Sequence, residues 1–443
     1  MNSYVRGTLA AALLATTSTM AMAADKVVVI TSFPNSMTGP IEAAFEAANP
    51  GVDLEILNKK TSAGVKYIQE LAGANTADVF WASAPDAFEV LKGDNLLATA
   101  SVTSTGIPDT IGSYPINDPD GKYIGFAAAG YGIMWNERYL KGNDLEPAKE
   151  WSDLKNPEYH GHVGMSAPSR SGTTHLTVET LLQGEGWDKG WAEWKWIAGN
   201  FATVTERSFG VPDGVNTGNF GLGIVIDFFG FSSKASGFPV DFAYPTVTAL
   251  VPANIAVVNE APNGDGARAF IEYLLTPAGQ EVLLDPAIMR LPVNPATYEA
   301  APKGFPNPFA EGSTIGAAVE FDVFKSKARY NLVNSMFDVM ITYRLDDLRS
   351  AVRAVQLAEA KHATGDNAEA KALIAEARAL IEANPIDEAQ SLDADFAATF
   401  TKKRKKVTDT VGERQAQVEQ GWDTMVVENY RRAQELAEKA AAM

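Results

Sequence analysis

Apolar and polar positions follow a regular order through the first part of the chain. "KVVVITSF", starting at residue 26, is a short apolar run typical of a buried strand, and "PIEAAFEAANPG" has the spacing of an amphipathic helix that ends at Asn-Pro-Gly. "VDLEILN", "GVKYIQELAGAN" and "ADVFWAS" then repeat the pattern as strand, helix and strand. Strands and helices in this succession predict an α/β fold with a parallel sheet.

A second α/β segment follows. It contains "GHVGMSAP", "FATVTE" and "GLGIVIDFFGF" as predicted strands, with a Trp-rich helix at "GWDKGWAEWKWIAGN". The chain then returns to the first unit through "YPTVTALVPANIAVV" and the helical region "GDGARAFIEYLLTPAGQEVLL". Two crossings predict a hinged pair of lobes with a ligand cleft between them. We expect lobe 1 at residues 24–126 and 246–315, and lobe 2 at residues 127–245.

The pattern changes again near residue 316, where long stretches rich in Ala, Glu, Lys and Arg begin. Apolar residues recur there every three to five positions, which predicts amphipathic helices. Residues 316–443 are therefore expected to form a helical extension. "KKRKK" at 402–406 is interpreted as a solvated helix face rather than a nucleic-acid or membrane contact. The repeating positions are Met336, Met340, Leu345, Leu348, Val352 and Val355.

The first 23 residues have the pattern of a secretory signal peptide. Arg6 precedes an apolar stretch from Leu9 to Leu14, and Ala21-Met22-Ala23 is a small-residue cleavage site. The stretch is too short for a membrane span. We expect cleavage after Ala23 and export to the periplasm.

Composition narrows the choice of partners. The 443 residues are 46% hydrophobic and 21% charged, with no cysteine, which suits a large globular protein without disulfides. Without the signal peptide, 36 basic residues face 55 acidic ones, a net charge of −19. This acidity disfavours nucleic acid and anionic membranes as partners.

The richest candidate chemistry lies in "APSRSGTTHL", directly before a predicted helix. Hydroxyls and free amides at a helix start favour an anion, a glycine lets the backbone approach it, and Arg170 can hold a phosphate or carboxylate by two hydrogen bonds. The alternative is ordinary helix capping, which needs only one or two such residues. The candidate ligand residues here are Ser169, Arg170, Ser171, Gly172, Thr173, Thr174 and His175.

Other candidates follow the predicted strands, because ligands of parallel sheets lie at the carboxyl ends of strands. The turn "TSFPNS" offers hydroxyl and amide donors, or is an ordinary turn, and "WASAP" ends the third strand. Trp81 is equally compatible with core packing, Arg207 with a structural ion pair, and Asp227 with capping of the next segment. The candidates in these segments are Ser32, Asn35, Ser36, Trp81, Ser83, Tyr131, Arg207 and Asp227.

Several motifs occur together in a familiar order. "YGIMWNERYL", "WSDLKNPEYHGHVGMSAPSRSGTT", "FIEYLLTPAGQE" and "RLPVNP" resemble segments of bacterial periplasmic solute-binding proteins of ABC transporters, over residues 26–300. The resemblance is to the cluster that binds ferric iron, thiamine, polyamines and phosphorylated solutes. It implies a two-lobed, type II periplasmic binding protein-like fold, with a C-terminal helical extension like that of phosphoglycerate-type binders. It also implies an ABC transporter permease as partner, and contact with the membrane only through that permease.

The residues favour one ligand class within this cluster. The hydroxyls and Arg170 suit an anionic, phosphorylated solute such as a phosphate ester or phosphonate. Ferric-binding relatives use adjacent tyrosines where this chain has Phe228 and Phe229, and phenyl rings cannot coordinate iron. Ferric-iron, thiamine and polyamine binding remain alternatives within the same fold. No metal or cofactor is expected.

An enzyme is the rival class of function. A hydrolase acting on phosphorylated substrates would need a nucleophile motif or a metal cluster, and neither is recognisable in the sequence. His160 and His162 form a pair in "HGH", but a zinc site needs further ligands, and a packed loop is the simpler interpretation. We therefore expect binding without turnover.

Overall fold

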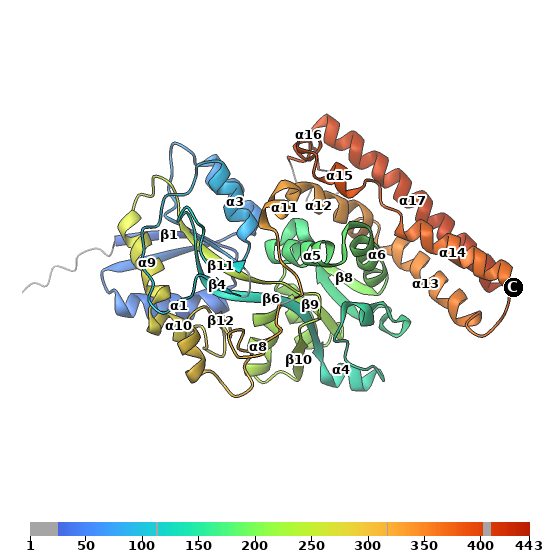
Figure 1. Cartoon of the computed structure of the whole chain (residues 1–443), viewed down its shortest axis with the longest axis horizontal. Helices are drawn as coiled ribbons and strands as arrows, with labels where there is room; N and C mark the ends of the chain where they lie inside the picture. Colours follow the sequence, from blue (N-terminus) through green and yellow to red (C-terminus); the bar gives the residue numbers. More distant parts are fainter. Residues whose placement is uncertain (1–24, 112–113, 317, 402–408) are drawn as a thin grey trace, which may run out of the picture.

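The computed structural model describes residues 25–111, 114–316, 318–401 and 409–443. The predicted signal peptide and "KKRKK" lie outside the described residues. Figure 1 shows two lobes side by side, with a bundle of helices attached to the second lobe at the end of the molecule farthest from the first. The two-lobed fold and the helical extension predicted from the sequence are confirmed.

Within these described ranges, ten strands form one continuous sheet. Along its main path the order is β2 (Val52–Asn58), β1 (Asp25–Thr31), β3 (Val79–Ala82), β11 (Leu250–Val257), β6 (Ile124–Asn136), β9 (Leu222–Ile226), β7 (Val163–Ser166) and β8 (Phe201–Thr205). β10 (Val240–Ala243) and β12 (Leu291–Pro292) also pair with β6. A separate pair, β4 (Thr110–Ile111) and β5 (Tyr114–Pro115), is antiparallel.

Lobe 1 contains the parallel strands β1, β2 and β3, with β11 antiparallel beside β3. β1 and β3 are largely buried because helices cover the sheet, whereas the edge strand β2 fully buries Leu54 alone. Its helices are α1 (Asn35–Ala48), α2 (Thr61–Glu70), α3 (Pro85–Gly93), α9 (Gly264–Leu275) and α10 (Pro277–Val282).

The start of α1 differs from the sequence prediction. The helix begins at Asn35, directly after Pro34, and Pro40 lies inside it, whereas the sequence suggested a turn before Pro40. Because proline lacks an N–H group, it is favoured at the first position of a helix, and the sequence therefore predicts a helix that starts at Pro40. Asn35 and Ser36 consequently lie in the first helical turn and not in a loop.

The lobes share β6, a strand of 13 buried residues. Its first part pairs with β11 of lobe 1, up to Gly130, and its second part pairs with β9 of lobe 2, from Tyr131 onwards. The predicted boundary between residues 126 and 127 therefore falls inside a strand. The second crossing runs from β10 to β11.

Lobe 2 has parallel strands β7, β8 and β9. Around them lie α4 (Glu137–Gly142), α5 (Gly172–Glu185), α6 (Trp187–Ala198), α7 (Gly210–Thr217) and α8 (Asp227–Ala235). The Trp-rich segment of the sequence is α6, as predicted.

The extension consists of helices from residue 323 onwards. They are α11 (Val323–Ala328), α12 (Tyr330–Phe337), α13 (Leu345–Lys361), α14 (Ala368–Glu382), α15 (Glu388–Ser391), α16 (Ala394–Ala397) and α17 (Glu413–Ala441), with a π-helical turn at Asp338–Thr342. Met336, Met340, Leu348, Val352 and Val355 are fully buried, so the predicted apolar stripes do face a core.

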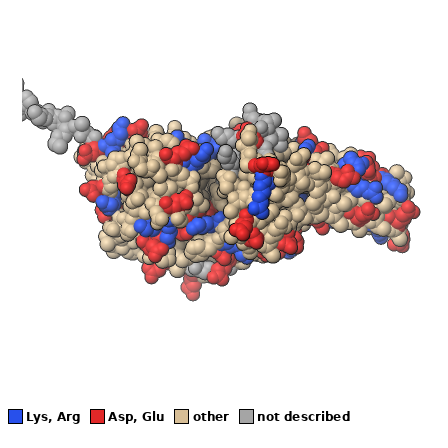
Figure 2. Space-filling view, turned by 90° about the horizontal axis from the view of Figure 1, so that it is seen from above, with Lys and Arg blue, Asp and Glu red and all other residues tan. Residues whose placement is uncertain are grey.

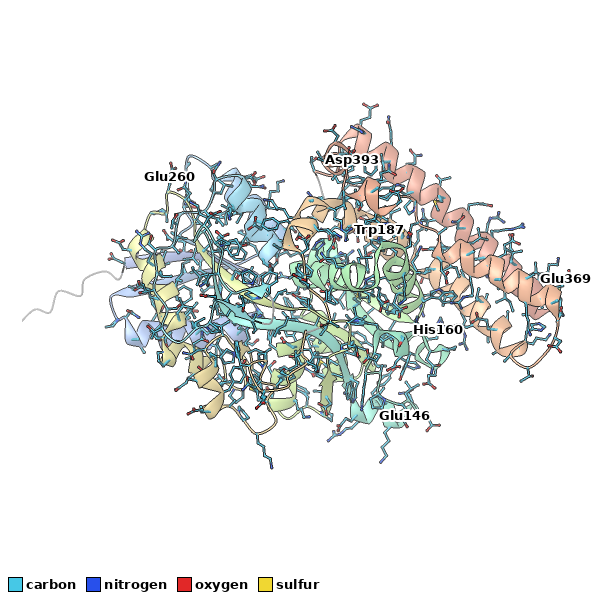
Figure 3. All side chains as sticks on the ribbon, in the orientation of Figure 1. Glu146, His160, Trp187, Glu260, Glu369 and Asp393 are labelled. Atoms are coloured by element: carbon cyan, nitrogen blue, oxygen red, sulfur yellow. The ribbon has the colours of Figure 1, made fainter. Side chains whose placement is uncertain are left out.

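That core is shared with lobe 2. The tryptophans of α6 pack in one hydrophobic cluster with residues of α12, α13, α14 and α17. Trp187 lies where lobe 2 meets the extension (Figure 3), and its indole N–H donates to the carbonyl of Ile386 at 3.1 Å. The extension is therefore one folded unit with lobe 2, and the Trp-rich helix α6 supplies a large part of the surface on which it packs.

Within the described residues, none of the helices combines the length and apolar character needed to span a membrane. On the face seen in Figure 2, acidic and basic side chains are interspersed over the lobes and the extension.

Candidate functional site

A small pocket lies between the lobes, where strands of both lobes end. It is formed by residues that follow β1 and β2 in lobe 1 and β7, β8 and β9 in lobe 2, as the strand-end rule predicts. Its volume is about 20 Å³, close to the space of a single water molecule. A larger solute can enter only if the lobes part. The residues lining this cleft pocket are Ser32, Phe33, Pro34, Lys60, Thr61, Arg170, Ser171, Thr173, Arg207, Ser208, Ile226, Phe228 and Phe229.

The start of α5 forms one wall. Ser171 is the N-cap, because its Oγ accepts from the amide of Thr174 at 3.3 Å, and it also lies 2.8 Å from the Thr173 hydroxyl. Ordinary capping thus accounts for Ser171, but Thr173 and Arg170 line the pocket as well. A helix N-terminus carries partial positive charge. This wall therefore favours an anion.

Three cationic side chains surround the pocket. Lys60 of lobe 1 and Arg170 of lobe 2 both reach Glu206, at 3.3 and 3.2 Å. The Glu206 side chain is 74% exposed, so solvent screens these pairs. Arg207 of lobe 2 donates to Asn58 of lobe 1 at 3.0 Å. An anion placed between Lys60 and Arg170 could take over the position of the Glu206 carboxylate.

The lobes approach each other closely at Gly172. A Cβ atom at this position would lie 2.7 Å from the Cβ of Ala84 and 3.0 Å from the Cγ2 of Thr61, both in lobe 1. Such contacts are too short for any other residue without a shift of the backbone. The structure therefore explains Gly172 by the packing of lobe against lobe.

A buried arginine lies behind the cleft pocket. Arg290 is 1% exposed, and its guanidinium packs over the rings of Phe33 and Phe228 at 4.7 and 4.6 Å. It donates to the Ser83 hydroxyl at 2.6 Å, and its Nε has no hydrogen-bond partner among the described residues. Burial lowers the pKa of Arg290 to about 10, so it stays charged at neutral pH. This cation contributes positive potential directly behind two lining rings.

Three of the predicted residues carry buried polar atoms that have no partner within the part of the chain that the structure describes. These are the indole N–H of Trp81, the hydroxyl of Tyr131 and the hydroxyl of Ser169. None of the three lines the cleft pocket. Unpaired polar atoms are costly inside a protein and are common where a ligand or water binds. Trp81 also packs edge to face against Phe33, at a ring distance of 5.1 Å.

Other predicted residues lie away from the cleft pocket. Asn35 and Ser36 are exposed on α1, because the helix starts earlier than the sequence suggested. Thr174 is buried one residue beyond the lining Thr173. Ser83 is occupied by Arg290.

His175 points into a different environment from the one predicted. It is fully buried, with Nδ1 2.9 Å from Asn334 Oδ1 and Nε2 3.1 Å from the Ser326 hydroxyl. Nε2 also lies 3.3 Å from Asp86 of α3. This cluster joins lobe 1, lobe 2 and the extension. The reason is helical geometry, which turns this residue away from Ser171 and Thr173 at the start of α5, which line the cleft pocket.

Asp227 likewise has a structural role, because its carboxylate is bonded within the fold. Its carboxylate accepts from the amides of Gly130 and Phe228, both at 2.7 Å, and from the Tyr244 hydroxyl at 2.8 Å. Burial raises the pKa of Asp227 to about 6, although these hydrogen bonds lower it. Asp227 is the first residue of α8, whose N-cap is Ile226, and its hydrogen bonds tie this helix to both crossings between the lobes.

The histidines of "HGH" are held within the fold. His160, labelled in Figure 3, contacts the carbonyl of Gly199 at 3.1 Å, and His162 lies 2.7 Å from the Tyr139 hydroxyl. Both are loop residues near the packed body of lobe 2. Across the ranges that the structure describes, no group of three or more potential metal ligands is present.

Sequence reasoning missed Lys60, Thr61 and Ser208 as lining residues, and Arg290 behind them. Lys60 follows β2 in "NKKTSAG", so the strand-end rule that was applied to β1 and β3 could have found it. Arg290 stands in "RLPVNP", far from the other motifs. Only the fold brings it to the cleft.

The shared sheet, the two crossings and the cleft pocket define a two-lobed binding protein. The chain matches the family of bacterial extracellular solute-binding proteins over residues 74–314, and it belongs to that family. The resemblance to solute-binding proteins of ABC transporters is confirmed.

Individual relatives extend this result. The chain is 33% identical over 384 residues to the phosphoglycerate transport regulatory protein PgtC of Salmonella typhimurium, covering 85% of this chain and 90% of the relative. The solved periplasmic binding protein AfuA of Actinobacillus pleuropneumoniae, with fructose-6-phosphate bound, has a TM-score of 0.62 at 19% identity. It covers 71% of this chain and 98% of its own. Apo ferric ion-binding protein A of Pasteurella haemolytica has a TM-score of 0.55 at 15% identity, covering 71% and 97%. These two likenesses show the fold alone.

Proposed function

We propose that this protein captures a phosphorylated small solute in the interlobe cleft and delivers it to the permease of an ABC importer. The observation that carries the proposal is the set of Lys60, Arg170 and Arg207 around a pocket floored by the start of α5. Phosphate offers several acceptor oxygens to such donors. The names of PgtC and of fructose-6-phosphate-bound AfuA support the same ligand class.

The lining also favours binding over catalysis. Its polar side chains are hydroxyls, Lys60 and two arginines, and among the described lining residues no histidine or carboxylate is present to act as a general base. Phe228 and Phe229 occupy the pocket wall, which supports rejecting the ferric alternative. We propose the periplasm as the location, with Ala24 as the mature N-terminus. N-terminal sequencing of protein released by osmotic shock tests this.

The central experiment is a thermal-shift screen of phosphate esters and phosphonates against neutral sugars. A ligand at 100 times its Kd adds about 2.7 kcal/mol to the free energy of unfolding. We expect phosphorylated compounds to raise the melting temperature without release of inorganic phosphate. Release of phosphate would indicate the hydrolase instead.

Arg170→Ala tests the residue assignment. Removing one partner of a buried charge pair costs about 2–5 kcal/mol of binding, and we expect a loss of this size by calorimetry. Arg268→Ala is the matched control, because Arg268 forms an exposed ion pair with Asp265 on α9. Normal affinity in Arg170→Ala, or a screen in which only neutral or cationic solutes bind, would contradict the anion site.

A further inference from the structure

A second cavity lies on lobe 1, away from the cleft pocket, and has a volume of about 680 Å³. One side is α3, with Glu89 and Lys92, and the opposite side is the segment Glu320–Phe324 that leads into α11. Its floor includes Asn254 of β11. Lobe 1 and the extension therefore build this α3 cavity together, and it shares no lining residue with the cleft pocket.

Asn254 is the distinctive feature of this floor. It is fully buried, and neither its Oδ1 nor its Nδ2 has a hydrogen-bond partner in the described structure. The pairing of β11 with β6 shifts register between Ala253 and Asn254. Such irregularities re-aim a side chain and are common next to binding sites. A buried amide with both atoms unpaired indicates a group that would donate to it and accept from it.

The charge of the lining selects a cation. Five carboxylates face one ammonium group in the lining, and Lys92 is held by Asp118 and Asp120 at 2.6 and 2.7 Å. Glu89 accepts from the Tyr123 hydroxyl at 2.7 Å and lies 3.5 Å from Lys327. The remaining acidic lining residues are Glu320 and Asp322.

Aromatic rings complete the walls. Tyr114 and Phe321 lie with ring centres 6.5 Å apart, and the 66% exposed Phe324 also lines the cavity. Ring faces attract ammonium groups and pack against apolar bodies. We propose that the α3 cavity binds a small primary amine that has an apolar body and one further hydrogen-bonding group, the latter paired with Asn254.

Tyramine is a suitable probe, because it has an ammonium group, a ring and a phenol. Tyrosol is its matched control, since a hydroxyl replaces the ammonium group. At about 150 mM salt, which limits unspecific attraction to the acidic surface, we expect tyramine to raise the melting temperature and tyrosol to have little effect. Equal responses to both compounds, or no response to tyramine, would overturn the proposed ligand class.

Asn254→Leu tests the site itself. This variant removes two unpaired polar atoms, so we expect a higher melting temperature without ligand and at least a tenfold loss of tyramine affinity. Asn216→Leu is the control, because Asn216 of α7 also has a buried unpaired Oδ1 but lies outside the cavity. A lower melting temperature for Asn254→Leu combined with normal tyramine binding would show that Asn254 is only structural, and would overturn the proposal.

Glu320→Lys provides a second variant that does not disturb the core, because Glu320 is exposed. It should weaken tyramine binding several-fold, and unchanged binding would count against the site. Binding of phosphate esters should be unaffected by Asn254→Leu and Glu320→Lys, and tyramine binding should be unaffected by Arg170→Ala. The two proposals can therefore fail separately.

Discussion

Two contact regions of lobe 2 differ in kind, although a hydrophobic cluster also runs through lobes 1 and 2. Toward lobe 1, the contacts around the cleft pocket are polar and partly exposed, as in the link from Lys60 through Glu206 to Arg170. Toward the extension, α6 buries its tryptophans against four helices. There Arg329 pairs with Glu179 through two hydrogen bonds of 2.8 and 2.9 Å, and both side chains are fully buried.

Exposed ion pairs contribute little stability, so the polar contacts around the cleft pocket can separate at low cost. A large apolar interface with a buried charge pair separates only if the fold itself is lost. The extension is therefore expected to move with lobe 2, and a movement of lobe 1 also has to disrupt the buried contacts of Asp86 with His175 and Ser326.

The largest expected effect is at the interface between lobe 2 and the extension. Arg329→Met leaves the buried Glu179 carboxylate without its partner, which typically costs about 3–5 kcal/mol. Denaturant unfolding should show a loss of this size, whereas Arg431→Met, at an exposed pair on α17, should change stability by less than about 1 kcal/mol. Equal effects of the two substitutions would remove the distinction between the interfaces.

Lys195 supplies a pH-dependent test of the same interface. Its Nζ lies 2.9 Å from the carbonyls of Glu382 and Ala383 at the end of α14, and burial lowers the pKa of Lys195 to about 7. In the unfolded chain the pKa of a lysine is about 10.4. Between these values the unfolded state binds a proton that the folded state does not, so stability rises with pH across this window.

We expect the free energy of unfolding to increase between about pH 7 and 10 by a few kcal/mol through this one group. Lys195→Met should remove that increase, which is read as the difference between the two proteins at each pH. A difference that stays constant with pH would show that Lys195 titrates normally.

At the cleft between the lobes, Gly172→Ala should hinder closure of lobe 1 against lobe 2. The added methyl group meets Ala84 and Thr61 of lobe 1, and overpacking of this kind costs about 1–3 kcal/mol. Affinity for the phosphorylated solute should fall by roughly 5- to 150-fold, with a wider lobe separation in solution scattering. Gly421→Ala, with open space around it on α17, is the control. Unchanged affinity would mean that the lobes need not meet here.

The smallest effect is expected at Glu206, whose exposed carboxylate occupies the place between Lys60 and Arg170. Glu206→Gln removes a competitor of the ligand, so phosphate-ester affinity should rise by less than about 1 kcal/mol. Weaker binding would instead show that Glu206 itself contacts the solute.

Sequence patterns predicted the fold well wherever the spacing of apolar residues matches the period of the helix or strand that they form. The strands β1 and β3 contain short apolar runs, β2 has polar residues between apolar ones, and α13 and α14 have regular stripes, so each could be recognised locally. The prediction for α1 was wrong because proline is favoured at helix starts in general, whereas here Pro40 lies inside a helix that begins at Asn35. The packing of the tryptophans of α6 against residues more than 100 positions later could not be derived from local pattern.

The site was predicted less completely for a related reason. Ser32, Arg170, Ser171, Thr173 and Arg207 follow strand ends and line the cleft pocket. His175 has the same polar character but faces α11 and α12, because a helix presents successive residues in different directions. Arg290 could be connected to the cleft only through the fold.

The shared strand β6 determines how the lobes can move. It passes from one half of the sheet to the other between Gly130 and Tyr131 with paired neighbours on both sides, and Asp227 bonds to the amide of Gly130 and to Tyr244 beside the second crossing. With these contacts on both sides of the crossing, we expect opening to occur as a rotation about β6, in which a small change at the strand produces a larger displacement at the rim of the cleft.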